Sequence, residues 1–248
     1  MAINIEYTTV DEAWQMRQVL ARDKNKYARV TMAYDYNTPP STLIRLAYDD
    51  DEIIRCGVAR NPATPPDTLA HLAKDRYYYV CVYVAQNESS PPVVLAKLAE
   101  HGGVGICREV ASNPSAPTRT LTRLAFSAEK DIRLAVARNP HTPPDTLEQL
   151  ANDDNEFVRC AVARNQNTSL KLLSVLAKSG DRHVREAVAH NVSTPTNILV
   201  QLTNDGNKYV RNTARSNLHM FIDLGLPAAV PMPSSSIPRT PRLTIERS

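Results

Sequence analysis

Cysteine and histidine are the residue types in this chain that could ligate a metal ion or supply a nucleophile and a base. The 248 residues include four cysteines and six histidines. A zinc or iron–sulfur site needs ligands brought together, usually by short spacings such as C-x-x-C, and no such spacing occurs. There is also no G-x-S-x-G elbow and no glycine loop suited to phosphate. We therefore expect no catalytic, cofactor-binding or metal-binding residues, and we interpret the cysteines as small structural thiols: Cys56, Cys81, Cys107 and Cys160.

Arginine is the other residue type with a suggestive spacing, because a guanidinium group binds phosphate through a planar fork. An aspartate stands six residues before four of the six arginines that share this spacing, which favours structural ion pairs between units over phosphate binding. The formal net charge of +3 gives nucleic acid no further support. The six arginines are separated by multiples of 26 residues: Arg29, Arg55, Arg133, Arg159, Arg185 and Arg211.

The arginine spacing belongs to a repeat that runs through most of the chain. VARNPATPPDTLAHLAKD at residues 58–75 returns as VARNPHTPPDTLEQLAND at residues 136–153, and the interval of 78 is three times 26. A fixed period of this length is typical of a solenoid, in which each unit buries its apolar face against its neighbours. We number each unit from a register residue, which is asparagine in seven of eight positions: Asp35, Asn61, Asn87, Asn113, Asn139, Asn165, Asn191 and Asn217.

Each unit is expected to contain two short helices. Apolar residues lie seven, four and three positions before the register residue, as in Ile132, Ala135 and Val136, and this is helical spacing. A proline often follows the register residue and should end that helix. We predict that the second helix begins at a threonine N-cap such as Thr64 or Thr142. The register side chains are expected to form a structural ladder that bonds helix-end backbone groups of the neighbouring unit.

One family shares this pattern. IRLAVARNPHTPPDTLEQLANDD, residues 132–154, resembles the units of the leucine-rich repeat variant family, which follow VRxAVARNPxTPPxTLxxLAxD. The resemblance covers about residues 23 to 217. It implies a right-handed superhelix in which an α-helix alternates with a shorter, often 3₁₀, helix, and it implies no reaction. Some members carry an iron–sulfur cluster bound by cysteines grouped ahead of the repeats, and this chain does not fit that part of the pattern.

The sequence divides into four parts. Residues 1–22 are expected to form an N-terminal arm and a capping half-repeat, with Thr9 and Glu12 in capping-box spacing and Trp14 covering the end of the stack. Residues 23–217 should form the all-α solenoid, a right-handed superhelix of about seven 26-residue units. Residues 218–227 are expected to close the core as a C-terminal cap. Residues 228–248 are rich in proline and serine and are expected to be a flexible tail.

Two sets of residues are candidates for contact with a partner. The position just before the register residue varies from unit to unit, so packing does not dictate it. Tyrosines concentrate in the first units, and tyrosine and arginine are enriched where proteins meet. The alternatives are that the variable column is a solvated rim and that the tyrosines fill space beside a unit containing Gly102, Gly103 and Gly105. The candidate partner-binding residues are Tyr34, Arg60, Tyr77, Tyr78, Arg138, Arg164 and His190.

These patterns together favour a non-enzymatic scaffold that binds a protein partner. The first alternative is a helical-repeat protein that binds nucleic acid through the arginine columns, and a less favoured one is an enzyme of the helical-repeat DNA glycosylase kind. No apolar run of about 18 residues is present, so no membrane span is expected. The first residues lack the basic flank and apolar core of a secretion signal, which predicts a cytoplasmic protein.

Overall fold

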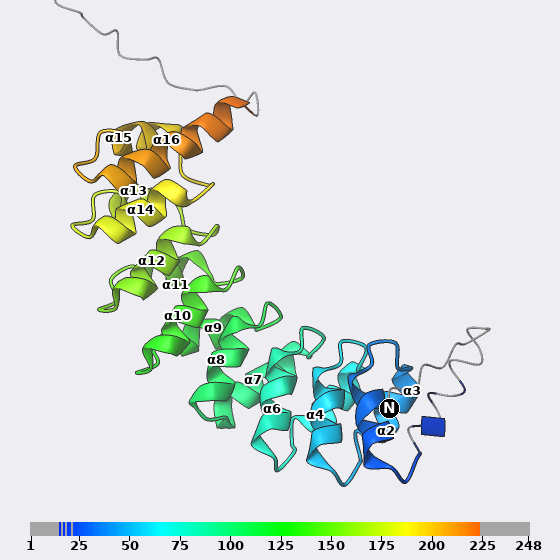
Figure 1. Ribbon diagram of the computed structural model, residues 1–248. Helices are drawn as coiled ribbons and strands as arrows, with labels where there is room; N and C mark the ends of the chain where they lie inside the picture. Colours follow the sequence, from blue (N-terminus) through cyan, green and yellow to red (C-terminus); the bar gives the residue numbers. More distant parts are fainter. Residues whose placement is uncertain (1–14, 16, 18, 21, 224–248) are drawn as a thin grey trace, which may run out of the picture.

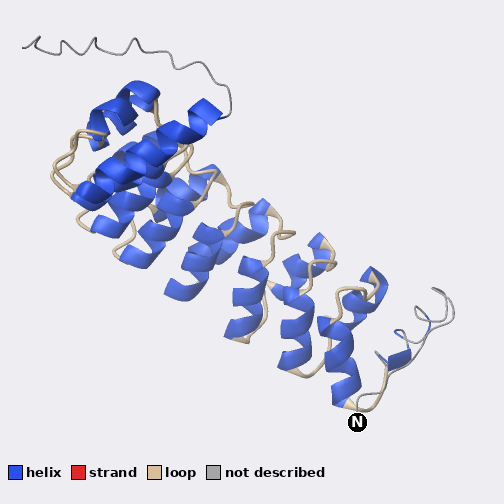
Figure 2. Cartoon of the chain, turned by 45° about the horizontal axis from the view of Figure 1, so that its top comes forward, coloured by secondary structure: helices blue, strands red, loops and turns tan. Residues whose placement is uncertain are grey.

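The computed structural model describes residues 15, 17, 19, 20 and 22–223. Within these residues the chain forms fifteen α-helices, labelled α2 to α16, and no strand (Figure 1). The helices follow one another along a curved array, so that α2 and α16 lie at opposite ends of it (Figures 1 and 2). The expected all-α solenoid is confirmed, and it holds seven complete two-helix units followed by α16.

The first helix of each unit carries an even number, and each packs against the next even-numbered helix. These first helices are α2 (Lys26–Tyr34), α4 (Glu52–Arg60), α6 (Tyr78–Gln86), α8 (Val104–Ser112), α10 (Lys130–Arg138), α12 (Glu156–Arg164), α14 (Arg182–His190) and α16 (Lys208–Asp223). The second helices are α3 (Pro40–Leu46), α5 (Pro66–Leu72), α7 (Pro92–His101), α9 (Thr118–Leu124), α11 (Pro144–Leu150), α13 (Leu170–Leu176) and α15 (Thr196–Leu202).

The core lies between the two rows of helices. Each second helix contributes a leucine that is 0% exposed, such as Leu69 or Leu147, and each first helix contributes apolar residues such as Ile132 and Val136. Burial of one such side chain contributes about 1.5–3 kcal/mol, whereas ordering each backbone residue costs about 1–2 kcal/mol. A single 26-residue unit therefore cannot fold alone, and stacking is required.

A column of alanines permits close approach of neighbouring first helices. These residues stand two positions before the register residue, and all are 0% exposed. A larger side chain would have to displace the adjacent helix, because protein interiors contain few voids. The alanines are Ala33, Ala59, Ala85, Ala111, Ala137, Ala163 and Ala189.

The register asparagines join each unit to the one before it. The Nδ2 of Asn139 donates to the carbonyl oxygens of Ala111 and Asn113, both at 2.8 Å. Its Oδ1 accepts the backbone N–H of His141 at 2.8 Å, which fixes the turn after the helix. All seven asparagines donate to the equivalent two carbonyls, at 2.7–3.2 Å. These carbonyls end the preceding first helix and have no partner within it, so the predicted ladder is confirmed.

The first register residue, Asp35, is an aspartate, and among the described residues its carboxylate accepts hydrogen bonds from Arg17 and from the turn that follows it. Its Oδ1 accepts the backbone N–H of Asn37 at 2.9 Å, as an asparagine would. Its Oδ2 instead accepts from Nε of Arg17 at 2.9 Å. A carboxylate suits this position because it only accepts, whereas the later positions need an amide that also donates.

The predicted threonine N-caps are wrong. The second helix α5 has Pro65 at its N-cap, without a side-chain cap, and begins at Pro66. The hydroxyl of Thr64 instead donates to the carbonyl oxygen of Val58 in the last turn of α4, at 2.6 Å. Thr142 makes the same bond to Val136. The unpartnered carbonyls at the end of the first helix therefore take the hydroxyl, and proline at the helix start lowers the demand for a cap acceptor because it has no N–H.

The last described unit also departs from expectation. Asn217 was expected to end its helix, but α16 continues to Asp223 because no proline follows to interrupt it. The Oδ1 of Asn217 then lacks the turn N–H that its counterparts accept, and it makes no hydrogen bond. Thr9, Glu12 and Trp14 of the predicted N-terminal cap and the tail at residues 228–248 lie outside the described residues.

Two glycines shorten the connection between α7 and α8. The second helix α7 has ten residues, whereas the other second helices have seven, and only Gly102 and Gly103 separate it from α8. A Cβ atom on Gly102 would lie 2.5 Å from the carbonyl oxygen of Leu98 and 2.6 Å from Cγ2 of Ile106. A side chain at the first of the two positions would therefore meet backbone, whereas a Cβ atom on Gly103 would meet nothing within 4 Å.

We expect the substitution Asn139→Asp to lower the free energy of unfolding by about 3–5 kcal/mol, because it removes two donors and faces a buried carboxylate with two carbonyl oxygens. Urea denaturation followed by circular dichroism measures the change. The reverse substitution, Asp35→Asn, is the control and should cost about 1 kcal/mol or less, since it removes one partly exposed ion pair. Equal losses at the two positions would contradict the ladder.

Candidate functional site

The arginine column forms a second ladder inside the solenoid. Nε of Arg133 lies 2.5 Å from Oδ2 of Asp153, and its Nη2 lies 3.0 Å from Oδ1, so the guanidinium binds the carboxylate with two hydrogen bonds. Arg159 reaches its carboxylate through one bond of 3.2 Å. We call these contacts the rungs of the arginine ladder: Arg29–Asp49, Arg55–Asp75, Arg133–Asp153, Arg159–Asp181 and Arg185–Asp205.

The same guanidinium groups also bind the turn that precedes their own helix. Nη1 of Arg133 donates to the carbonyl oxygens of Ser127 and Ala128, both at 2.9 Å. The aspartate six residues before an arginine therefore contributes its backbone carbonyl, and the carboxylate comes from an aspartate about twenty residues later, at the start of the next unit. The prediction of structural pairing between units is confirmed, with this change of partner.

The rungs hold their carboxylates in the ionised form. Burial opposes ionisation of Asp153, but the hydrogen bonds from Arg133 and from the backbone N–H of Asn155 outweigh it, so the pKa of Asp153 lies below its usual value. The hydrogen bonds to Asp153 raise the pKa of Arg133 in turn. Five of the six guanidinium groups in the column thus bind carboxylates of the protein itself, whereas the guanidinium of Arg211 donates to the backbone carbonyls of Asp205 and Gly206. The column is therefore mainly structural, which weakens the nucleic-acid alternative.

The ladder is interrupted in the middle of the array. Cys81 stands where an arginine would, and His101 stands where its carboxylate would; Cys107 and Ser127 replace the next pair. The Cys81 thiol lies 3.5 Å from the carbonyl oxygen of Ala73 and 3.4 Å from that of Asp75, and it can donate to either of them. Burial raises the pKa of Cys81, which keeps the proton on the sulfur. Each thiol therefore takes over the arginine's hydrogen bonds to backbone carbonyls, but the cysteine side chain is much smaller than the arginine side chain.

The variable column lies where the first helices end. All of its predicted members are exposed. Arg60 stands over the ring of Tyr83, with its Cζ 6.0 Å from the ring centre. The ring of Tyr34 lies against Gly57, where a Cβ atom would come within 2.7 Å of it. The members on these helix ends are Tyr34 (α2), Arg60 (α4), Arg138 (α10), Arg164 (α12) and His190 (α14).

A second exposed column was missed from the sequence. It stands eight positions before the register residue, on the same side of the helix as the variable column, because seven residues make two turns. Five of its members are large apolar or aromatic side chains with 45–78% of their surface exposed. The signal was present in the sequence, because aligning the units at the 26-residue period places these large side chains at one position. They are Tyr27, Ile53, Tyr79, Phe157 and Tyr209. We call the two columns together the first-helix face.

The two columns meet around α12. Arg138 and Arg164 border a hollow of about 150 Å³ together with Phe157, Cys160 and Ala161. A neighbouring hollow of about 490 Å³ is bordered by Arg138 and the preceding first helix. Two of the predicted arginines are thus brought together beside an exposed aromatic ring, whereas Tyr34 lies four units before Arg138 and His190 lies one unit after Arg164.

The tyrosine run divides between packing and exposure. Tyr77 is the N-cap residue of α6, and Tyr78 is its first residue. The Tyr78 hydroxyl occupies the space beside Gly105 that a Cβ atom would need, so this ring fills the gap next to the glycine-containing unit. The ring of Tyr79 contacts both neighbouring tyrosine rings, with centroids 5.8 Å and 5.5 Å away, and belongs to the first-helix face.

Comparison with known proteins agrees with this architecture. The profile of the Leucine Rich Repeat Variant domain matches residues 131–192, and that of the leucine rich repeat variant matches residues 54–76. A solved structure described as a leucine-rich repeat variant with a novel repetitive protein structural motif is 22% identical, with a TM-score of 0.57 over 84% of this chain and 82% of its own. No curated protein sequence matches the chain.

Designed proteins resemble the chain more distantly. A designed armadillo repeat protein is 13% identical, with a TM-score of 0.28 over 83% of this chain and 98% of its own. Another, in complex with the peptide (KR)4, is 15% identical, with a TM-score of 0.25 over 85% of this chain and 92% of its own. The described helices themselves define the class of protein, an α-solenoid of two-helix repeats. The repeats at residues 54–76 and 131–192 match the models of the leucine-rich repeat variant family.

Among residues 15, 17, 19, 20 and 22–223, no three histidine, cysteine or acidic side chains are grouped so that they could hold a metal ion. No helix in the described part of the chain is both long enough and apolar enough to cross a membrane.

We expect the substitution Asp153→Asn to lower the free energy of unfolding by about 1–3 kcal/mol at pH 6. The pKa of Asp153 is lowered in the folded state, so the contribution of its carboxylate to the free energy of unfolding is complete above about pH 5. This contribution is lost as pH falls through the folded-state pKa. The variant should therefore differ less from the parent in stability near pH 3. Urea denaturation at both pH values measures this. Asp154→Asn, at an exposed neighbour, is the control and should change neither value.

Proposed function

We propose that this protein is a non-enzymatic scaffold, located in the cytoplasm, that binds a protein partner through its first-helix face. The observation that supports this most directly is the exposed column of large apolar and aromatic residues, repeated at the period of the solenoid. Exposed apolar side chains that recur along one face differ from the scattered ones found on every surface, and they are typical of interaction sites.

The composition of the face favours protein over nucleic acid. Aromatic residues and arginines such as Phe157, Arg138 and Arg164 are the side chains most enriched in the energetically important parts of protein interfaces. Acidic side chains lie among them: Asp131 borders the same hollow as Arg138, and Glu109 pairs with Arg108 at 2.7 Å. A face that must follow a phosphate backbone would instead carry a continuous positive charge.

The regular spacing suits an extended partner segment. Neighbouring first helices lie side by side along the array, so equivalent side chains recur at one helix spacing, about 8–10 Å. Aromatic residues of successive units can therefore contact side chains spaced along one partner segment, and the variable column beside them would select the sequence of that segment. No reaction is assigned to this face, because its residues form no acid–base or nucleophile pair.

The test is affinity capture from native cell extract with the intact chain as bait. We expect the double variant Phe157→Ser, Arg164→Glu to recover about tenfold less of the captured protein, because it removes an aromatic anchor and reverses a charge beside it. The control is Phe126→Ser, which removes an exposed phenylalanine, 70% exposed, that follows the second helix α9. Mass spectrometry of the captured protein measures recovery.

Two outcomes would contradict the proposal. Undiminished recovery by the double variant, with recovery lost instead in Phe126→Ser, would move the interface to the row of second helices. Recovery that disappears after nuclease treatment of the extract would favour the nucleic-acid alternative.

A further inference from the structure

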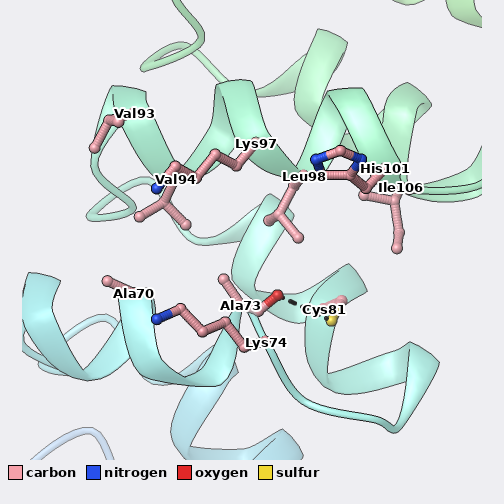
Figure 3. Close-up of a pocket in the computed structure, with 11 residues that line it drawn as sticks. Ala70, Ala73, Lys74, Cys81, Val93, Val94, Lys97, Leu98, His101 and Ile106 are labelled. Carbon is pink, nitrogen blue, oxygen red and sulfur yellow. Dashed lines mark hydrogen bonds between the residues drawn. The ribbon is translucent and has the colours of Figure 1, made fainter.

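A cavity of about 390 Å³ opens between the second helices α5 and α7, above α6. Figure 3 shows Ala70 of α5, with Ala73 and Lys74 just after this helix, on one wall and residues of α7 on the facing wall, with Cys81 of α6 at one end. The walls are mostly aliphatic and include Val94, Leu98 and Ile106, which are buried. The cavity is separate from the first-helix face, because no residue of that face lines it.

This cavity lies at the first interruption of the arginine ladder. Cys81 and His101, the two residues that replace the missing rung, both line it. At the preceding, intact rung the guanidinium of Arg55 binds Asp75 at 2.6 Å, and both residues border a hollow of about 430 Å³. At the interrupted rung the Cys81 thiol makes its hydrogen bonds to backbone carbonyls, and a thiol and an imidazole replace the charged pair at the border of the hollow.

The interruption also changes the charge of the site. The carboxylate of the missing rung is absent, while Lys74 and Lys97 border the cavity from opposite walls and His101 adds an imidazole. Both lysines are exposed, and among the described residues neither makes an ion pair. The aspartate nearest in sequence, Asp75, is already bound by Arg55. The cavity is therefore an aliphatic hollow with two lysines at its edge and no carboxylate among the described residues of its lining, although Lys74 also borders a neighbouring hollow that Asp49, Asp50 and Asp75 line.

We propose that this cavity binds an acidic peptide segment of a protein partner, with one apolar side chain inserted into the hollow and adjacent carboxylates bound by Lys74 and Lys97. The inserted side chain contacts the aliphatic walls, and the carboxylates of the segment supply the negative charge that an aspartate at the position of His101 would have carried. We choose an acidic segment because its carboxylates complement the charge of the two lysines, whereas a basic segment would be repelled by them. The proposal extends the proposed function by a second contact region of stated chemistry.

The probe is a fluorescein-labelled synthetic pentapeptide, Glu-Glu-Phe-Glu-Glu, whose binding to the intact purified chain is measured by fluorescence anisotropy. Two matched peptides, Lys-Lys-Phe-Lys-Lys and Glu-Glu-Ala-Glu-Glu, test the charge and the apolar side chain. We expect the acidic phenylalanine peptide to bind about tenfold more tightly than either matched peptide. Equal binding of the basic peptide would overturn the proposal.

The variants test the position of the site. Lys74→Glu should weaken binding of the acidic peptide about tenfold, whereas Lys178→Glu, at the same position of a unit whose arginine rung is intact, should leave it unchanged. The double variant Cys81→Arg, His101→Asp restores the rung, so it should abolish binding and also raise the melting temperature. The rise in melting temperature shows that the variant folds and that the rung has formed.

The outcomes separate this proposal from the proposed function. The proposed site would be overturned by a double variant Cys81→Arg, His101→Asp that melts at a higher temperature but still binds the acidic peptide as the parent does. It would also be overturned if the protein bound all three peptides equally and decanoate displaced them, because that result would assign the cavity to a small amphiphile. Loss of partner capture in the first-helix face variants leaves these results unaffected, because the peptide assay uses neither that face nor cell extract.

Discussion

The solenoid depends on one hydrogen-bonding arrangement, the register asparagine that serves two units at once. Its Nδ2 group donates to two carbonyls at the end of the preceding first helix, and its Oδ1 accepts the N–H that closes the turn of its own unit. A short helix leaves several carbonyls unpartnered at its end, and these are buried once units stack. The asparagine and the threonine hydroxyl three residues later satisfy them, which allows alanines and leucines to pack without leaving buried polar groups unpaired.

The arginine ladder is a second connection of the same kind, but it is optional. An arginine and its carboxylate are removed together, at Cys81 with His101 and at Cys107 with Ser127, and a thiol takes over the bonds to backbone carbonyls. Losing only one partner would leave a partly buried charge without compensation, whereas replacing both avoids that penalty. The paired loss leaves the hollow beside Cys81 without the charged pair that borders the equivalent hollow at Arg55 and Asp75.

Function is consequently expected where the repeat leaves side chains unconstrained. The columns one and eight positions before the register residue point away from both packed rows, so their residues can change without affecting the ladders. The cavity at the interrupted rung is a different case, because what changes there is the chemistry of its lining, which loses the arginine and the carboxylate. An α-solenoid can thus vary its binding surfaces both at its exposed columns and at a structural contact.

The sequence alone determined the period, the two-helix unit, the place where the first helices end and the asparagine ladder, because these follow from local spacing repeated in every copy. It could not determine which carboxylate each arginine binds, because the partner about twenty residues later becomes adjacent only after the next unit has stacked. Thr64 and Thr142 were assigned to the wrong helix end for the same reason: a hydroxyl can serve either neighbouring helix, and the geometry of the turn decides. The meeting of Arg138, Phe157 and Arg164, and the cavity beside Cys81, likewise arise from contacts between units, which only the tertiary structure brings about.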